Sequence, residues 1–514
     1  MKVLRKLNKT LKNILDKDNG GSGQKTVDQD NIYHSKHDSQ KNTETSPPQD
    51  ENIRTPALWA FEVYTPSYIA NFHEGVRKLG WTQDDWSVSS DFQDTLHNLR
   101  SRASGSGWIN LGYIFDETKK GCWPGTKKAK LPDGIKAIKA SILQFLPSTT
   151  ILACQFVFTD ELANSVENPL REIYSTYKEK TKNGYRIIDV PHQKKEAVVL
   201  VREYLKNLCT CWFTENFPGL FSAGYLDGDF PVCELVTFEK HTPYQKVDAK
   251  NHDNFLSVLD LSHDFDAWQS DELEGMFLQH AEGRNNNNKT HNLVLSGNIN
   301  EMLSNKDMKG YGKTTEDKIL NYLNYLDRTL GIWVLFVIAR TFERRFTKLR
   351  DAYGEFDIDD PNNNPSILMN LDRQILDIQK NTTPFIYELK DFCEHERFFM
   401  HDVFEFKAVH EMRKKDDGLF SSIRKRLIFY AELLDRNEKL LRSTADANRQ
   451  IVTIKASSYL AQTNIGLQKR MNWMTLVILL LTIVTTFSAI IEIKKKYDFS
   501  TIFEKVINIL KSFT

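Results

Sequence analysis

The residues that could do chemistry in this sequence are histidines and carboxylates in two short clusters. His395 and His401 lie in HERFFMH, which superficially resembles the HExxH helix of zinc proteases. Two zinc-binding histidines on one helix are four residues apart, so that they share a face, whereas these two are six apart. Asp357, Asp359 and Asp360 in FDIDDP could bind a cation, but acidic residues beside proline and asparagine are typical of turns. We therefore predict no metal site and no catalytic residue.

Motifs for nucleotide binding or covalent catalysis are absent: the sequence contains no P-loop, GxGxxG, GxSxG or kinase signature. Basic residues are concentrated between residues 100 and 130 and could bind an anion or nucleic acid, but a solvated loop is the favoured interpretation. The formal net charge is zero, so no global basic field indicates nucleic acid, and we do not expect that partner. No cofactor is predicted, and whether the chain is an enzyme stays open, with a non-enzyme favoured.

The six cysteines are scattered without CxxC spacing. Cys209 and Cys211 are two residues apart in a predicted helix and therefore lie on different faces, which does not suit a zinc site. We expect reduced, mostly buried thiols, and these fit a reducing compartment.

The elements that would position any site are organised around residues 471–491, MNWMTLVILLLTIVTTFSAII. This stretch has no charged residue and is about as long as the 20 residues that a helix needs to cross a hydrocarbon core. Lysine and arginine flank it on both sides. We predict a single transmembrane helix here. Its small hydroxyl residues are candidates for close helix packing, although they can equally bond to their own backbone: Thr475, Thr482, Thr485, Thr486 and Ser488.

Residues 1–18 place lysine and arginine between apolar residues at helical spacing, which indicates a basic amphipathic helix or a frayed, solvated one. They lack the apolar core of a signal peptide, so we expect the bulk of the chain to be cytosolic. Residues 451–470 contain three lysines and arginines and residues 492–511 contain five, a difference that slightly opposes this orientation. Residues 19–53 are polar and are predicted to be a disordered linker.

Residues 54–300 are predicted to form an α/β or α+β cytosolic domain, because strand-like and helix-like segments alternate there. The expected strands are 58–64, 108–115, 151–158, 232–238, 255–261 and 291–295. The expected helices are 67–79, 160–180, with Asp160 as a cap, and 193–215.

Residues 314–470 are predicted to form an α-helical hairpin and a long stalk helix. Thr314 and Asp317 resemble a capping box, and the apolar run 330–339 is expected to be a buried core helix. A helix from Ser366 should end or kink at residues 381–384, NTTP, and residues 389–406 should pair with 420–441 as an antiparallel hairpin.

From residue 419 onward no proline follows, so one helix of roughly 70 residues should lead into the span. Its seam is Ile451, Ile454, Ser458, Ala461 and Ile465, which indicates pairing within the hairpin or between subunits nearer the membrane. Residues 492–514 are predicted to be an amphipathic tail, either an interfacial helix or a small tail beyond the membrane.

The order of elements from about residue 314 to residue 491 resembles the CorA family of divalent-cation channels. In that family a cytosolic α/β domain and a helical hairpin lead through a long stalk helix into the membrane. The family has two membrane helices with a Gly-Met-Asn motif after the first. Here Met471 and Asn472 begin the span without the glycine and no second span follows, so no pore residue is carried over.

We therefore expect a homo-oligomeric, single-span membrane protein in the lipid bilayer. Its cytosolic domain would sense a ligand and the stalk would transmit the signal to a membrane bundle, as a CorA-like channel or a membrane effector. Two alternatives stay open. The first is a membrane-tethered enzyme or defence effector with its site in residues 55–300, and the second is an anchored scaffold.

Overall fold

The computed structural model describes residues 36–80, 92–101, 107–119, 126–181, 184–223, 230–244, 254–262, 264–280, 292–304, 308, 310–354, 365–395, 404–413, 418–496 and 499–512. The chain divides into two units. The first comprises Met1–Ala352 and Met369–Lys439, and the second comprises Tyr353–Leu368 and Leu440–Thr514.

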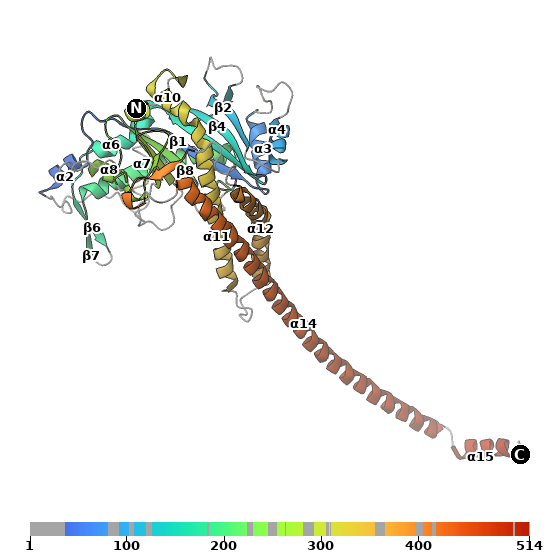
Figure 1. Cartoon of the computed structure of the whole chain (residues 1–514). Coiled ribbons are helices and arrows are strands. Elements are labelled where there is room, and N and C mark those ends of the chain that lie inside the picture. The colour runs from blue at the N-terminus through green and yellow to red at the C-terminus, as the bar shows by residue number, and fades with distance from the viewer. Residues whose placement is uncertain are drawn as a thin grey trace. The chain divides into compact units, whose positions relative to one another are not determined.

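A ten-stranded mixed sheet forms the centre of the first unit (Figure 1). Its strand order is β12-β9-β10-β11-β8-β1-β5-β4-β2-β3, and the pairs β8–β11 and β2–β3 are parallel, whereas the other pairs are antiparallel. The strands are β1 (Ile53–Tyr64), β2 (Gly107–Asp116), β3 (Lys127–Ala129), β4 (Ile135–Leu146), β5 (Thr149–Phe158), β8 (Val232–Phe238), β9 (Trp268–Ser270), β10 (Met276–His280), β11 (Asn292–Asn298) and β12 (Phe406–Ala408). A separate hairpin consists of β6 (Tyr177–Thr181) and β7 (Gly184–Ile188).

One face of the sheet is covered by α3 (Ile69–Lys78) and α7 (Val190–Asn216). Successive residues of a strand point to opposite faces. Tyr64 of β1 packs on Phe72 of α3, with ring centroids 4.9 Å apart, and Phe156 of β5 packs on Trp212 of α7 at 5.8 Å. Asp189 begins α7 by accepting a hydrogen bond from the backbone of His192.

The opposite face is covered by α10 (Thr315–Tyr322) and α11 (Leu326–Gly354). Phe61 of β1 meets Trp333 of α11 edge to face at 6.4 Å. A Cβ at Gly331 would lie 2.6 Å from the side chain of Leu143, so the absence of a side chain lets α11 approach β4 closely. The apolar run 330–339 is thus confirmed as a buried core helix. Thr314 also caps α10 as predicted, accepting a hydrogen bond from the Asp317 backbone.

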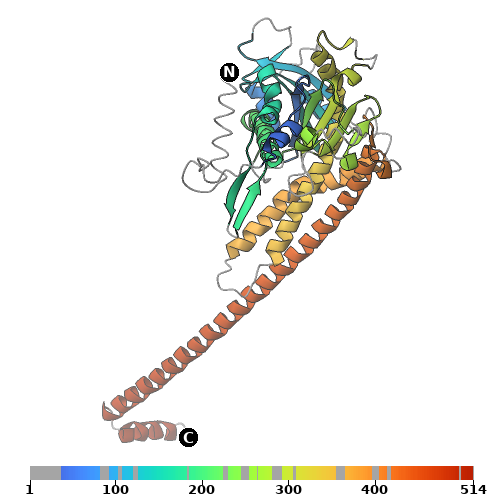
Figure 2. The ribbon, with the colours of Figure 1, turned by 90° about the vertical axis from the view of Figure 1, so that its left-hand side faces the viewer.

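Two further long helices pack beside α11: α12 (Pro365–Glu394) and the start of α14 (Leu419–Lys496) (Figures 1 and 2). Thr383 of α12 bonds to Glu438 of α14 at 2.9 Å, and Arg424 of α14 donates to the carbonyl of Cys393 at 2.7 Å. Cys393 follows Thr383 in α12, whereas its partner Arg424 precedes Glu438 in α14, so the two helices are antiparallel. The predicted hairpin therefore has α12 as the partner of α14.

The remaining elements are shorter. They are α2 (Asp38–Glu44), α4 (Phe92–Ser101), α5 (Asp160–Ala163), α6 (Glu167–Arg171), α8 (Asn254–Val258), α9 (Ile299–Met302), α15 (Phe499–Lys511) and the 3₁₀ turns η2 (Asn164–Val166), η3 (Asp264–Asp266), η5 (Leu323–Tyr325) and η6 (Glu411–Arg413).

The α/β domain followed by a long helix is confirmed, and five of the six predicted strands are present as β1, β2, β5, β8 and β11. The predicted strand 255–261 was wrong, because α8 and a turn occupy it. The predicted helix 160–180 was also wrong: it is three short helical pieces followed by β6. Asp160 does not cap a helix. Its carboxylate pairs with Arg54 at 2.5 Å.

The helix end predicted as one outcome at residues 381–384 was wrong, because α12 runs through Pro384. Two polar side chains of this stretch bond to carbonyls of their own helix: Asn381 to Asp377 at 3.0 Å and Thr382 to Ile378 at 3.0 Å. The helical seam 389–406 was also wrong at its end, since Phe406 lies in β12.

The predicted linker 19–53 contains ordered structure at its end. Asp38 of α2 accepts hydrogen bonds from the backbone and hydroxyl of Thr176, at 2.9 and 2.6 Å. Asn42 bonds to both backbone groups of Tyr174. The segment was predicted to be disordered because its apolar content is low. The contacts that order its end are hydrogen bonds, which apolar content does not reveal.

Among the residues that the structure describes, α14 alone is long and apolar enough to cross a membrane, by length and composition. No part of its most apolar stretch is buried within the chain. The cysteines described are free thiols, with Cys154, Cys209, Cys233 and Cys393 buried and Cys211 exposed. The predictions for residues 1–18, for Asp357, Asp359 and Asp360, and for most of HERFFMH lie outside the described residues.

Candidate ligand-binding site

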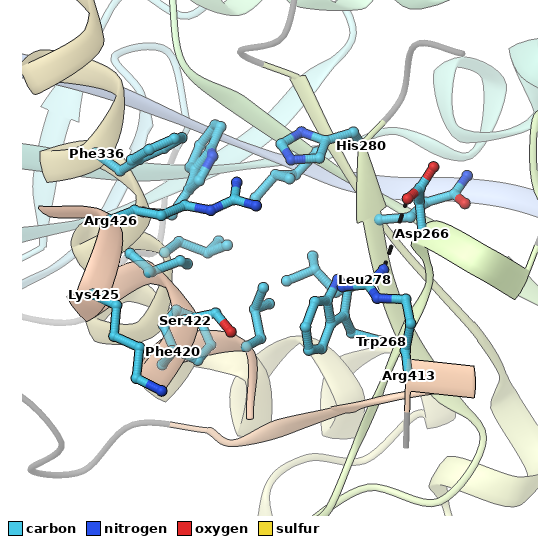
Figure 3. Close-up of a pocket in the computed structure, with 16 residues that line it drawn as sticks. Asp266, Trp268, Leu278, His280, Phe336, Arg413, Phe420, Ser422, Lys425 and Arg426 are labelled. Carbon is cyan, nitrogen blue, oxygen red and sulfur yellow. Dashed lines mark ion pairs between the residues drawn. The ribbon is translucent and has the colours of Figure 1, made fainter. Parts of the chain in front are cut away.

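A cavity of about 440 Å³ lies between the end of the sheet that carries β9, β10 and β11 and the helices α11 and α14 (Figure 3). Its volume falls in the range of about 300 to 1,000 Å³ that is typical of small-molecule sites. The lining residues are Asp266, Trp268, Leu278, Gln279, His280, Leu293, Leu330, Trp333, Phe336, Arg413, Leu419, Phe420, Ser422, Ile423, Lys425 and Arg426.

Three residues of α11 form an apolar wall. Leu330, Trp333 and Phe336 are three residues apart, so they lie on one side of the helix. Trp333 is only 3% exposed, and its Nε1 has no hydrogen-bond partner among the described residues. A buried donor without a partner costs about 1 to 3 kcal/mol. A residue that lines the cavity therefore carries an unused hydrogen-bond donor.

Trp268 of β9 forms part of another wall and is covered by Arg413. The guanidinium of Arg413 lies 4.5 Å from the ring centroid of Trp268. It also donates to the carbonyl of Phe265 at 2.6 Å and lies 3.7 Å from the carboxylate of Asp266, the ion pair drawn as a dashed line in Figure 3. These contacts fix Arg413 as a structural part of the wall that still contributes positive charge.

The first two turns of α14 form a further wall. Leu419, Ser422, Ile423 and Arg426 follow three- and four-residue steps and so share one side of the helix. The side chain of Arg426 reaches into the middle of the cavity (Figure 3). It makes no hydrogen bond or ion pair with any part of the chain that the structure describes. Its guanidinium is therefore available to a ligand.

Positive charge exceeds negative charge around the cavity. The lining includes the cations Arg413, Lys425 and Arg426 against the single carboxylate of Asp266. Cations on low-dielectric, partly apolar walls attract anions more strongly than the same charges do in open water. The lining is thus chemically compatible with an anion that has an apolar part, although Lys425 and Arg426 are themselves exposed.

A second cavity, of about 1,030 Å³, lies beside α2. Polar groups of its lining already bond within the domain. The imidazole of His241 pairs with Glu51 at 2.5 Å, and Glu51 also accepts the backbone N–H of Glu239 at 2.7 Å. The hydroxyl of Ser46 accepts a hydrogen bond from the buried ammonium of Lys194 at 2.9 Å. These contacts hold the segment that carries α2 on the domain, which makes this cavity the weaker candidate.

Two fully buried carboxylates, Glu62 and Asp327, have raised pKa values, but neither lines either cavity. Burial raises the pKa of Glu62 to about 7, but its oxygens accept backbone N–H bonds from Val63, Phe221 and Ser222 at 2.9 to 3.0 Å. Burial raises the pKa of Asp327 to about 6. Both carboxylates are occupied by the fold itself.

The structure places the predicted packing residues of the span on α14. The hydroxyls of Thr475, Thr482, Thr485 and Thr486 donate to carbonyls of their own helix at 2.7 to 2.9 Å. Packing of these residues and of Ser488 against another copy stays a prediction. His395, the residue after the end of α12, bonds to the carbonyl of Asp391 in that helix. Across the part of the chain that the structure describes, no group of three His, Cys, Asp or Glu side chains could hold a metal ion.

The residues that form the cavity were not singled out from the sequence. Trp333 lies in a run that was correctly assigned to the core, and Arg426 belongs to the triplet RKR at 424–426, which resembles a solvated helix face. The available signal was the position of this triplet in the first turns of a very long helix. The chain matches no known protein-family model and shows no significant similarity to a curated protein.

Proposed function

We propose that this protein is a membrane-anchored sensor, in which a ligand bound in the α/β domain acts on the membrane span through α14. The observation that carries this proposal is the continuity of α14. Leu419 and Arg426, in its first two turns, line the cavity, and the same unbroken helix contains the apolar stretch 471–491. A ligand that displaces or fixes Arg426 would act directly on the helix that enters the bilayer.

Membrane insertion is supported by the composition and exposure of the end of α14. Residues such as Leu480 and Val484 are more than half exposed, so the chain itself offers no core for them. The bilayer is the partner proposed for this stretch. The tail helix α15 presents Phe503, Val506 and Ile507, which are exposed and suit the membrane surface.

Assembly of several copies is the second part of the proposal. The seam residues Ile451, Ile454 and Ile465 are exposed in the single chain, at three- and four-residue spacing. A homo-oligomer would bury them and would gather the spans into a bundle. Such a bundle, acting as a CorA-like channel or as another membrane effector, is the output that we propose.

Catalysis is the weaker alternative. The buried carboxylates Glu62 and Asp327 are occupied by hydrogen bonds from the fold, and the cavity is lined by one carboxylate, which is paired with Arg413. An anchored scaffold has no specific contact in its favour.

The test of the proposed function is membrane extraction of the full chain. We expect wild type to resist alkaline carbonate and to require detergent. The double variant Leu480→Lys and Val484→Lys should lose this resistance, because a lysine in the middle of a membrane helix costs roughly 2.5 to 3.5 kcal/mol. The matched control is Leu460→Lys, which lies on the same helix outside the apolar stretch and should behave as wild type. Release of the wild type by carbonate would refute the anchor.

A further inference from the structure

We propose that the cavity binds a small organic anion that carries a planar ring, the chemical class to which nucleotides belong. This inference deepens the proposed function and depends on it only for what binding does to the membrane span. It combines two features of the cavity: an unpartnered guanidinium and aromatic walls.

The anionic group is assigned to Arg426. Its guanidinium lies in the cavity without a protein partner among the described residues, and a planar guanidinium donates paired hydrogen bonds to phosphate or carboxylate oxygens. Arg413, held on Trp268, adds a second positive charge to the lining. Asp266 is paired with Arg413, so the repulsion that it would exert on an anion is reduced.

The planar ring is assigned to the aromatic walls. Trp268 and Phe336 line the cavity from β9 and α11, and aromatic side chains are favourable surfaces for a flat, polarisable ring. Trp333, in the same lining, adds a further aromatic side chain. A bare inorganic anion would leave these apolar walls unused.

The size of the cavity selects a small molecule. A volume of about 440 Å³ accommodates a ligand of mononucleotide size and excludes a folded partner. The ligand would contact α11 and α14 together, since Phe336 belongs to one helix and Arg426 to the other. Binding would therefore fix the start of α14 relative to α11.

The experiment is calorimetric titration of the full chain in detergent, with EDTA present so that no metal shields the anion. The probes are the four ribonucleoside triphosphates, the corresponding nucleosides and inorganic triphosphate. We expect at least one nucleoside triphosphate to bind. We also expect its nucleoside and inorganic triphosphate each to bind at least about tenfold more weakly, since each lacks one half of the recognition.

Variants locate the binding in this cavity. Arg426→Ala should weaken binding at least about tenfold, and Arg426→Lys should recover part of it because the charge remains. The matched control is Arg436→Ala, an exposed arginine on the same helix that does not line the cavity.

Several outcomes would overturn this inference. They are the absence of binding by every triphosphate at about 1 mM, equal binding of inorganic triphosphate or of a nucleoside, and unchanged binding by Arg426→Ala. An equal loss of affinity in Arg436→Ala would also overturn it, because binding would then depend on the positive charge of the protein surface and not on this cavity. The outcome of the binding experiments does not depend on whether carbonate releases the chain from the membrane. A chain that binds the nucleotide but is released by carbonate would refute the proposed anchor and leave the ligand assignment standing.

Discussion

The indole Nε1 of Trp59 in β1 donates a hydrogen bond of 3.0 Å to the carboxylate of Asp327 in the first turn of α11. The hydroxyl of Ser141 in β4 donates to the other carboxylate oxygen. One buried carboxylate thus joins two strands to the helix that, two turns later, presents Trp333 to the cavity. The position of this cavity wall is set by a polar contact inside the core.

Replacement of Asp327 by asparagine should destabilise the first unit. Asparagine has one acceptor oxygen where aspartate has two, so either Trp59 or Ser141 loses its hydrogen-bond acceptor. The substitution also removes the negative charge near Lys139. Loss of buried charged hydrogen-bond partners costs about 2 to 4 kcal/mol. Denaturant unfolding of the purified chain would measure this loss. Asp351→Asn, an exposed aspartate of the same helix, should change stability by less than about 0.5 kcal/mol. Equal effects of both variants would contradict the structural role of Asp327.

Glu62 should make stability depend on pH. Burial raises its pKa from 4.5 to about 7, so the folded state binds more protons than the unfolded state between these two values. Stability falls with rising pH wherever the folded state binds more protons. The contribution of Glu62 is therefore fully present below pH 4.5 and is lost as the pH rises through about 7. A shift of this size corresponds to about 3 kcal/mol.

The variant Glu62→Gln isolates this contribution because glutamine does not titrate. The difference in unfolding free energy, wild type minus variant, should decrease by about 3 kcal/mol between pH 4.5 and pH 7. Denaturant titrations of both proteins across this range would measure it. Asp327 titrates in both proteins and cancels in the difference. A difference that is constant with pH would show that Glu62 has an ordinary pKa in the folded chain.

Elements with a strong local pattern were predictable from the sequence. β8 has the predicted limits, and α14 follows from a chain without proline from residue 419 onward. The predictions failed where a long-range contact overrode the local pattern. In α12, which continues through Pro384, Asn381 accepts a hydrogen bond from the hydroxyl of Thr65 at 2.7 Å, and Asp160 turns to Arg54 on a distant strand rather than to its own helix.

The cavity could not be predicted, because its parts are distant in sequence. Trp268, Trp333 and Arg426 come from a strand and two helices, and each type of residue has a common structural role in its own element. Only the strand order of the sheet and the packing of α14 beside α11 bring them to one place. A sequence pattern records the face of one element and does not record which distant element will meet it.

Lys194 should hold the segment that carries α2 on the domain. Its buried ammonium donates to the hydroxyl of Ser46 at 2.9 Å and to the carbonyls of Leu170 and Asn42 at 2.6 and 3.3 Å. Lys194→Met leaves these buried acceptors without their donor, so residues 38–46 should exchange amide hydrogens about tenfold faster or more. Hydrogen-exchange mass spectrometry would measure this. The neighbouring Lys195→Met, whose ammonium pairs with Asp260, should leave α2 protected. Unchanged exchange in Lys194→Met would show that other contacts hold the segment.

The exposed seam of α14 should determine assembly. Ile451, Ile454, Ser458, Ala461 and Ile465 alternate three- and four-residue steps, which is the spacing of a coiled-coil interface. Ile454 and Ile465 are 65% and 54% exposed in the single chain, so a second copy would bury them. The double variant Ile454→Glu and Ile465→Glu places like charges inside that interface. We expect the wild-type mass in detergent to be that of an oligomer and the variant mass to be that of a monomer or a smaller assembly.

The matched control for the seam is the double variant Leu460→Glu and Leu467→Glu. Leu460 and Leu467 are similarly exposed and seven residues apart, but they lie on the side of α14 away from the seam. The same number of glutamates there should leave the oligomer intact, because they would face solvent. Light scattering corrected for bound detergent would give the mass of each protein. A monomeric wild type would exclude the bundle, whereas dissociation by both double variants would show that added charge, and not loss of the seam, separates the chains.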